Sequence, residues 1–401
     1  MDSDEVLIGR RLRALRGKRS LAATAELAGI SQSYLSRLER GERQINSRHL
    51  LEALADALRV APSELMAFPF PSRDPVTAEA QAAISGVETA LSEYRLGEPS
   101  DVEPRPWPVI AAELRRLNQE LRPACDYAAQ GLVLPRLLAE LHAVHEAGGE
   151  HRTDALLGLM DCYHTATVLT KNLGAQGLPQ LAALHAQMVA DALGSPEWAG
   201  LAAWLRAHAL GGSDRPRQVT ISMRAANSLQ SELGSPEVAQ VYGMLHLSCA
   251  LAAAAKRQAD DAEAHLREAE EIASRLPEVG TFGSLYFGRA NIAIWRVSIG
   301  TELGWGPKVA EAAEAARPDA VPSAARQAMY WADLGRALVE SPKTRERGVL
   351  ALRRAEDIAP QRIRTNALVR ASVTELANRA KRDALGRELR GMVHRMGVRL
   401  G

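Results

Sequence analysis

The stretch that decides the fold of this chain is LAGISQSYLSRLERGER, residues 27–43. Gly29 stands where a left-handed backbone residue can end one helix, and Ser31 stands where a hydroxyl can cap the next. Leu35 and Leu38 then share one face at helical spacing, which predicts a short helix with its polar residues on the opposite face. Two short helices joined by a sharp turn are therefore expected here.

Short helices are also predicted on both sides of this pair. The first carries an apolar stripe from Val6 to Leu15, and a second begins after Ser20. A later helix begins after Asn46 or Ser47 with a stripe of leucines. Pro62 occupies the first position of a last helix, where its missing N–H costs nothing. Residues 1–68 are thus predicted to form a five-helix domain.

Positive charge is concentrated at this end of the chain. The window 6–48 has ten Lys and Arg against three Glu, a net charge of +7, whereas the whole chain carries +1. The remaining residues therefore sum to −6. Such asymmetry is typical of one end that meets a polyanion, and a solvated charged helix is the alternative interpretation.

The opening run resembles the XRE/Cro/phage-repressor family of helix-turn-helix domains, over about residues 8–66. AGIS matches the turn, SQSYLSRLE the recognition helix and RGER the exit loop. The resemblance implies that the recognition helix lies in the major groove of double-stranded DNA. It assigns base reading to Gln32, Ser33, Ser36 and Arg37. It assigns phosphate contacts to Arg19, Arg40, Arg43, Asn46 and Ser47. A helical hairpin that does not bind DNA is the alternative.

Prolines predict where this domain ends. Residues 67–76 contain three prolines and residues 97–108 contain four, and proline interrupts a helix because it lacks the backbone N–H. One helix is expected between these breaks, over 77–96. The chain is therefore predicted to divide into a DNA-binding domain (1–68), a linker with one helix (69–107) and a helical body (108–401).

The body repeats itself every 43 residues. The octets MRAANSLQ, LREAEEIA, VAEAAEAA and LRRAEDIA begin at 223, 266, 309 and 352. Repeats of this period predict stacked helical units. The best copy, from Trp331 to Pro360, resembles the tetratricopeptide repeat (TPR), with Gly335 and Ala355 small enough for two helices to approach closely. The fold class is therefore predicted to be all-α: a five-helix helix-turn-helix domain followed by a TPR-like α-solenoid. A plain helical bundle is the alternative.

The phase of the repeat predicts which residues line a concave groove. They are His246, Tyr286, Arg289, Arg296, Arg336, Glu375 and Arg379. A groove rich in Arg suits a carboxylate, so these positions other than Glu375 are the predicted effector site. Arg289, Arg296 and Arg336 are expected to face one another without enough acid to balance them. The alternative is that they are ordinary solvated surface residues.

A helix-turn-helix domain, hereafter the head (1–68), joined to a TPR-like body resembles the domain arrangement of the RRNPP peptide-pheromone receptors and of the XRE–TPR regulators of actinomycetes. The resemblance implies a transcription regulator controlled by a peptide, an acidic small molecule or a partner protein. A homodimer on an inverted repeat is expected, because one small head buries too little surface for tight specific binding. A TPR scaffold with secondary DNA binding is the competing function.

The same sequence argues against several other classes of protein, namely enzymes, metalloproteins and membrane proteins. No catalytic constellation, phosphate-binding loop or metal-ligand spacing is present, so no enzymatic activity, cofactor or metal is expected. The three cysteines are isolated, as in a reducing compartment. No apolar run approaches the ~18 residues of a membrane span, so a cytoplasmic protein without membrane contact is expected.

Overall fold

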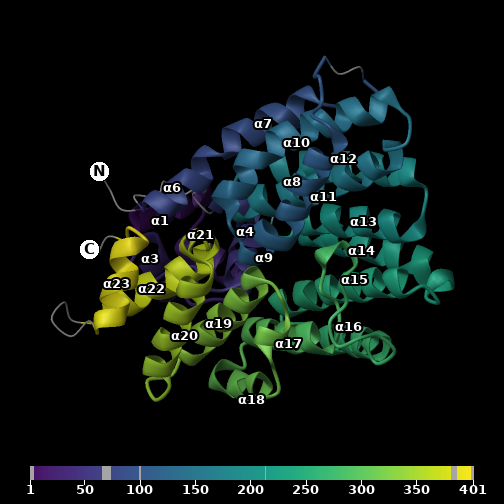
Figure 1. Ribbon diagram of the computed structural model, residues 1–401. Coiled ribbons are helices and arrows are strands. Elements are labelled where there is room, and N and C mark those ends of the chain that lie inside the picture. Colours follow the sequence, from purple (N-terminus) through teal and green to yellow (C-terminus); the bar gives the residue numbers. More distant parts are fainter. Residues whose placement is uncertain (1–3, 66–73, 99–100, 213, 381–385, 399–401) are drawn as a thin grey trace.

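The computed structural model describes residues 4–65, 74–98, 101–212, 214–380 and 386–398. Within these ranges every regular element is a helix, which confirms the all-α prediction (Figure 1). The head contains five helices: α1 (Asp4–Arg16), α2 (Leu21–Leu27), α3 (Gln32–Glu39), α4 (Arg48–Leu58) and α5 (Pro62–Leu65).

The head has a hydrophobic core of its own, separate from that of the body. Its fully buried leucines come from four of the five helices: Leu12, Leu35, Leu54 and Leu65. The turn between α2 and α3 forms as predicted, because Gly29 adopts a φ of +63° and the Ser31 hydroxyl accepts the N–H of Tyr34 at 3.2 Å. These contacts hold α3 at a set angle to α2.

The segment between the head and the repeats differs from the single helix expected over 77–96. Two helices occupy it, α6 (Pro75–Ala82) and α7 (Ile84–Glu93), with Ala83 between them. Both pack on α10, and Val87 and Leu91 are buried in the core of the body. Because both helices have an apolar face, this segment packs on the body instead of forming an extended linker. Part of the predicted linker, 69–73, lies outside the described residues.

The body is a succession of helices in which each packs mainly on its neighbours in the chain. They are α8 (Trp107–Arg116), α9 (Arg122–Ala124), α10 (Tyr127–Ala147), α11 (Arg152–Asn172), α12 (Leu178–Leu193), α13 (Pro196–Leu210), α14 (Arg215–Leu229), α15 (Pro236–Ala255), α16 (Ala259–Ala273), α17 (Arg289–Leu303), α18 (Val309–Glu314), α19 (Ala324–Leu338), α20 (Arg345–Ile358), α21 (Pro360–Arg364), α22 (Ala367–Arg379) and α23 (Arg387–Arg395). A π-helical turn, Leu117–Leu121, joins α8 to α9. This nearest-neighbour packing is solenoid-like, as predicted.

The repeated octets fall on α14, α16, α18 and α20, the second helix of each unit. Their in-phase alanines Ala226, Ala269 and Ala355 are buried, whereas Ala312 in the short α18 is half-buried. At the best copy, a Cβ on Gly335 would lie 2.9 Å from the carbonyl oxygen of Gly348. The absence of that Cβ lets α19 and α20 approach closely.

The solenoid curves until its last helices meet its first (Figure 1). The Gln361 side chain of α21 accepts the backbone N–H of Tyr127, at the start of α10, at 2.6 Å. The Thr365 hydroxyl donates to the Asn172 carbonyl at 3.1 Å, and Arg364 pairs with Asp74, which caps α6, at 2.8 Å. The body is therefore a closed ring of helices, a closure that the repeats in the sequence do not predict.

One helix of the described residues, α15, is long and apolar enough to cross a membrane by length and composition alone. Of its most apolar window, 94% is buried inside the protein. It packs between α13, α14, α16 and α17, so it is a core helix of the ring.

Candidate DNA-binding surface

The recognition helix α3 has one buried and one exposed face. Leu35 and Leu38 anchor it in the head core, at 0% and 3% exposure. Gln32 and Ser33, at its N-terminal end, are exposed, and Ser36 and Arg37 are half-exposed. The structure therefore brings the four predicted base-reading residues onto one accessible face, with the Arg37 guanidinium 5.9 Å from the Tyr34 ring.

Two of the predicted phosphate-binding arginines have contacts within the head. Arg19 is exposed and donates to the Ala57 carbonyl at 2.7 Å. Arg40 is exposed and pairs with Glu42 at 2.6 Å. Water screens the attraction within a solvent-exposed ion pair, so the arginine readily exchanges its carboxylate partner for another anion. Both side chains are thus accessible to a phosphate.

Of the other three predicted phosphate contacts, the body holds two, Arg43 and Asn46. The Glu375 carboxylate of α22 accepts hydrogen bonds from Arg43 and, at 2.9 Å, from the Asn46 amide. Arg379 donates to the same carboxylate. Ser47 caps α4, its hydroxyl accepting the N–H of Leu50 at 3.2 Å. The exit loop after α3 therefore lies against α22.

A buried carboxylate on α17 makes the second head–body contact. Glu302 accepts from the guanidinium of Arg48 at 2.5 Å and from its backbone N–H at 3.1 Å. Arg336 donates to Glu302 at 3.0 Å, to Asp333 at 2.9 Å and to the Asn46 carbonyl at 3.1 Å. Burial alone would raise the pKa of Glu302, but Arg48 and Arg336 lower it to about 2.

A third contact joins α4 of the head to α14 of the body. The Nε of Arg215 lies 2.5 Å from the Glu52 carboxylate, and both side chains are buried. All three contacts are ionic or charge-assisted, and each joins residues of the head to residues of the body. The exit loop and the first half of α4 are therefore the docking face of the head.

The predicted effector-groove residues are not brought together. His246 packs against His265, with their Nδ1 atoms 3.1 Å apart, and no group of three metal-ligating side chains occurs among the described residues. Arg289 is exposed at the start of α17. Tyr286 lines a cavity at the centre of the ring that the other five do not reach.

The prediction that acids do not balance the groove arginines is wrong for two of them. Arg296 pairs with Glu263 at 3.4 Å and with Glu270 at 2.6 Å. Arg336 is buried between the two acids described above, and Arg379 pairs with Glu375. Glu263, Glu270 and Glu302 come from neighbouring helices, so repeat phase within one helix could not reveal them. They supply the charge balance that the prediction assigned to an effector.

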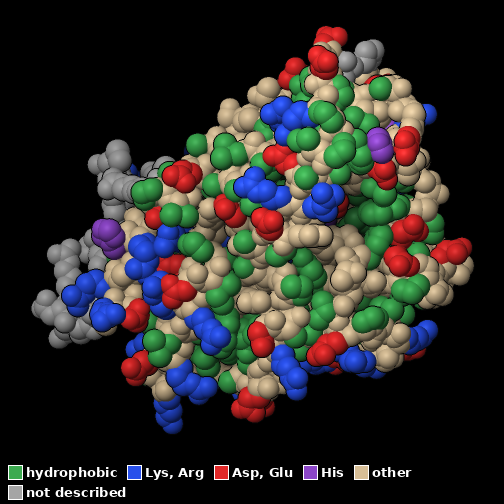
Figure 2. All heavy atoms as spheres, in the orientation of Figure 1, with side chains coloured by type: hydrophobic (Ala, Val, Ile, Leu, Met, Phe, Trp, Pro, Cys, Tyr) green, Lys and Arg blue, Asp and Glu red, His purple; other side chains and the backbone are tan. Residues whose placement is uncertain are grey.

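Basic side chains also gather over α20, α22 and α23 (Figure 2), and α22 is the helix that contacts the exit loop. The exposed ones are Lys343, Arg347, Arg354, Arg379, Arg387 and Arg390. One of them, Arg379, pairs with Glu375. The gathered positive charge adds to the field that attracts polyanions.

Comparison with known proteins agrees with this geometry. Residues 7–68 match a helix-turn-helix domain family, a span that ends within three residues of α5. No curated protein and no solved structure matches the chain. The chain therefore contains a helix-turn-helix domain over residues 7–68, and in this it is similar to DNA-binding regulators.

Proposed function

We propose that the chain is a sequence-specific transcription regulator whose XRE-type head alternates between operator DNA and the TPR-like body. The observation that carries the proposal is the contact of Glu375 with Arg43 and Asn46. By the family resemblance these two residues would contact phosphate, and a carboxylate offers them the same anionic oxygens. DNA and α22 would therefore compete for one set of donors.

The competition gives the protein two states. In the docked state the exit loop faces the body, and in the released state it faces the DNA backbone. A ligand that binds one of these states more tightly than the other changes the DNA affinity of the chain. The size of the change is set by the difference between the ligand's affinities for the docked and the released state. We further propose a cytoplasmic homodimer that binds an inverted repeat, with 1–68 as its DNA-binding domain, 69–107 as its linker and 108–401 as its regulatory and dimerisation body. Sedimentation of the full chain with and without operator DNA tests the dimer.

The experiment that tests the competition is Glu375→Gln. A duplex is first selected from random sequence with the full chain, and affinities are then measured by fluorescence anisotropy at fixed salt. We expect Glu375→Gln to bind about 10-fold tighter, since a charge-assisted hydrogen bond contributes about 1.5 kcal/mol. Glu263→Gln is the matched control, because it also removes one acid that pairs with an arginine, but that arginine, Arg296, belongs to the body.

Three outcomes are informative. If the full chain selects no sequence, the regulator function is wrong. If Glu375→Gln binds the duplex as the wild type does while Glu263→Gln is also unchanged, docking does not compete with DNA. If both variants bind more tightly by the same factor, the gain reflects net charge alone and the competition is again wrong.

A further inference from the structure

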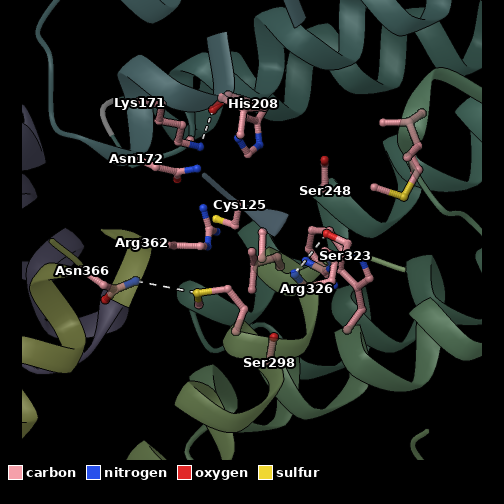
Figure 3. Close-up of a pocket in the computed structure, with 18 of the residues that line it drawn as sticks. Cys125, Lys171, Asn172, His208, Ser248, Ser298, Ser323, Arg326, Arg362 and Asn366 are labelled. Carbon is pink, nitrogen blue, oxygen red and sulfur yellow. Dashed lines mark hydrogen bonds between the residues drawn. The ribbon is translucent and has the colours of Figure 1, made fainter. Parts of the chain in front are cut away.

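A cavity of about 400 Å³ lies at the centre of the ring (Figure 3). Its wall includes residues of α9–α11, α13–α15, α17, α19, α21 and α22 from the body, and Arg48 from the head. A volume of this order is typical of sites for small molecules, and helices from all around the ring contribute to its wall. The size favours a compact ligand over an extended peptide.

Three cations point into this cavity from three different helices: Lys171, Arg326 and Arg362 (Figure 3). None of them forms an ion pair with a described residue. Lys171 donates to the His208 carbonyl at 2.5 Å, Arg326 to the Asn291 side chain at 3.0 Å and Arg362 to the Tyr127 hydroxyl at 3.2 Å. All three acceptors are uncharged.

The wall supplies little negative charge in return. Asp333 is the one acidic residue among the described lining residues, and its two oxygens already accept from Arg336 at 2.9 Å and from Ser298 at 2.6 Å. Buried cations without a counter-charge are costly to the fold, so proteins seldom keep several together without a compensating anion. Burial, reinforced by neighbouring arginines, lowers the pKa of Lys171 to about 7.

The same wall holds polar atoms that have no hydrogen-bond partner. Among the buried unpartnered atoms of the described residues are Arg326 Nη2, Arg362 Nε, His208 Nε2, Gln218 Oε1 and the indole N–H groups of Trp204 and Trp295. Four of these six, the two arginine nitrogens and the two indole nitrogens, always carry a hydrogen and can donate it. Buried donors are rarely left without an acceptor. They fit a ligand with several acceptor oxygens.

Two aromatic rings border the cations. The Arg326 guanidinium lies 4.7 Å from the Trp295 ring, and the Trp204 ring stacks on His208 with centroids 5.0 Å apart. Indole faces offer a planar apolar surface next to the unpaired charges. The cavity therefore combines an anion-binding end with surfaces for a flat apolar group.

We propose that this cavity binds a small organic anion, a carboxylate, sulfonate or phosphate on a planar apolar body, with Arg326, Arg362 and Lys171 holding the anion and Trp204 and Trp295 contacting the planar part. This site is distinct from the predicted groove, with which it shares Tyr286 alone.

The cavity also touches the docking face of the head, and this step rests on the proposed function. Arg48 and Arg215 line the cavity and pair with Glu302 and Glu52 in the head–body contacts. An anion in the cavity competes with these carboxylates for the two arginines. Ligand binding therefore weakens docking, frees the exit loop and raises DNA affinity.

The test uses the full chain and three matched probe pairs. The anions are 2-naphthoate, 2-naphthalenesulfonate and 2-naphthyl phosphate, and their uncharged counterparts are 2-naphthamide, 2-naphthalenesulfonamide and 2-naphthol. Calorimetry measures binding, and the fluorescence of Trp204 and Trp295 reports occupancy. We expect at least one anion to bind about 10-fold more tightly than its uncharged counterpart.

Two variants locate the site. Arg326→Gln is expected to reduce anion binding at least about 10-fold and, without any ligand, to raise the melting temperature, because it removes an unpaired buried charge. Arg289→Gln, an exposed arginine outside the cavity, should change neither. If no anion binds better than its uncharged counterpart, the proposal is wrong. It is also wrong if Arg326→Gln lowers the melting temperature and leaves anion binding intact.

DNA binding is measured separately, so the two proposals fail independently. We expect the bound anion to raise duplex affinity in the wild type and not in Arg326→Gln. Selective duplex binding without anion binding would overturn the cavity site and leave the regulator. Anion binding without a change in duplex affinity would overturn the coupling and leave the site.

Discussion

Arg48 of the head meets Glu302 of the body twice, through its guanidinium at 2.5 Å and through its backbone N–H at 3.1 Å. The N–H belongs to the first residue of α4, where a helix end favours a negative group. The carboxylate is fully buried, and Arg336 donates to it at 3.0 Å from the body side. One acid thus binds cations from both parts of the chain, which defines the face on which the head docks.

Glu302→Gln should therefore destabilise the folded chain strongly. The substitution leaves Arg336 buried with Asp333 alone and removes the counter-charge of Arg48, a loss of about 3–5 kcal/mol by analogy with broken buried pairs. Urea unfolding measures the change. Glu263→Gln, which removes a half-exposed acid, should cost less than about 1 kcal/mol. Equal effects of the two variants would contradict this account.

The same carboxylate predicts an acid-sensitive stability. Its pKa in the folded chain is about 2, because the two arginines outweigh the effect of burial, whereas its ordinary value is 4.5. The stabilisation is therefore fully present above about pH 4.5 and is lost as pH falls toward 2. Melting temperatures between pH 6 and 3 should fall more steeply for the wild type than for Glu302→Gln. Parallel curves would show that Glu302 is not the group responsible.

Lys171 predicts a second rise of stability with pH, on the alkaline side. Burial, with Arg362, Arg215 and Arg48 nearby, lowers its pKa from 10.5 to about 7. Between those values the unfolded chain binds the additional proton, so stability should rise with pH across this window and be constant below it. Unfolding at pH 7, 8 and 9 should show a smaller rise for Lys171→Met than for Lys256→Met, whose parent lysine is exposed. A rise of the same size in both would contradict the shifted pKa.

Arg37 and Arg43 should affect DNA binding in different ways. Arg37→Ala removes a proposed base contact, so it should cost about 1–3 kcal/mol on the selected duplex and relax preference at one position. Arg43→Ala removes a proposed phosphate contact, so it should weaken all sequences alike and reduce the salt slope by about one unit. Repeating the selection with each variant measures both effects. An unchanged preference for Arg37→Ala would show that α3 is misplaced on DNA.

Gly335→Ala tests the close approach of α19 and α20. The new Cβ would lie 2.9 Å from the Gly348 carbonyl oxygen and 2.8 Å from Leu352, so the helices must separate, at a cost of about 1–3 kcal/mol. Gly234→Ala is the control, because no heavy atom lies within 4 Å of its added Cβ. Thermal unfolding distinguishes the two. A tolerated Gly335→Ala would mean that the repeat packs more loosely than described.

The head could be predicted residue by residue because its signals are local. A left-handed Gly29, a capping Ser31 and the spacing of Leu35 and Leu38 act over one or two helical turns, and each of them holds in the structure. The same is true of the repeat, where Gly335 has the packing role assigned to it. The break at Ala83 escaped prediction because no proline or glycine marks it.

The head–body contacts and the cavity could not be predicted in this way. Arg48 and Glu302 are 254 positions apart, and nothing in either local pattern requires them to meet. The glutamates that pair with Arg296 and Arg336 likewise come from other helices, so a count of charges along one helix face missed them. Lys171, Arg326 and Arg362 look like ordinary basic residues in the sequence.

The sequence by itself thus determined the helix-turn-helix domain, the all-α class and the 43-residue period, since all three follow from spacing along the chain. Only the tertiary structure decided that the ring closes, that Glu375 holds Arg43 and Asn46, and that unpaired cations surround a central cavity. The physical reason is that charge pairing and enclosure depend on distances between helices. Those distances are fixed by how the repeats stack, and no local pattern encodes them.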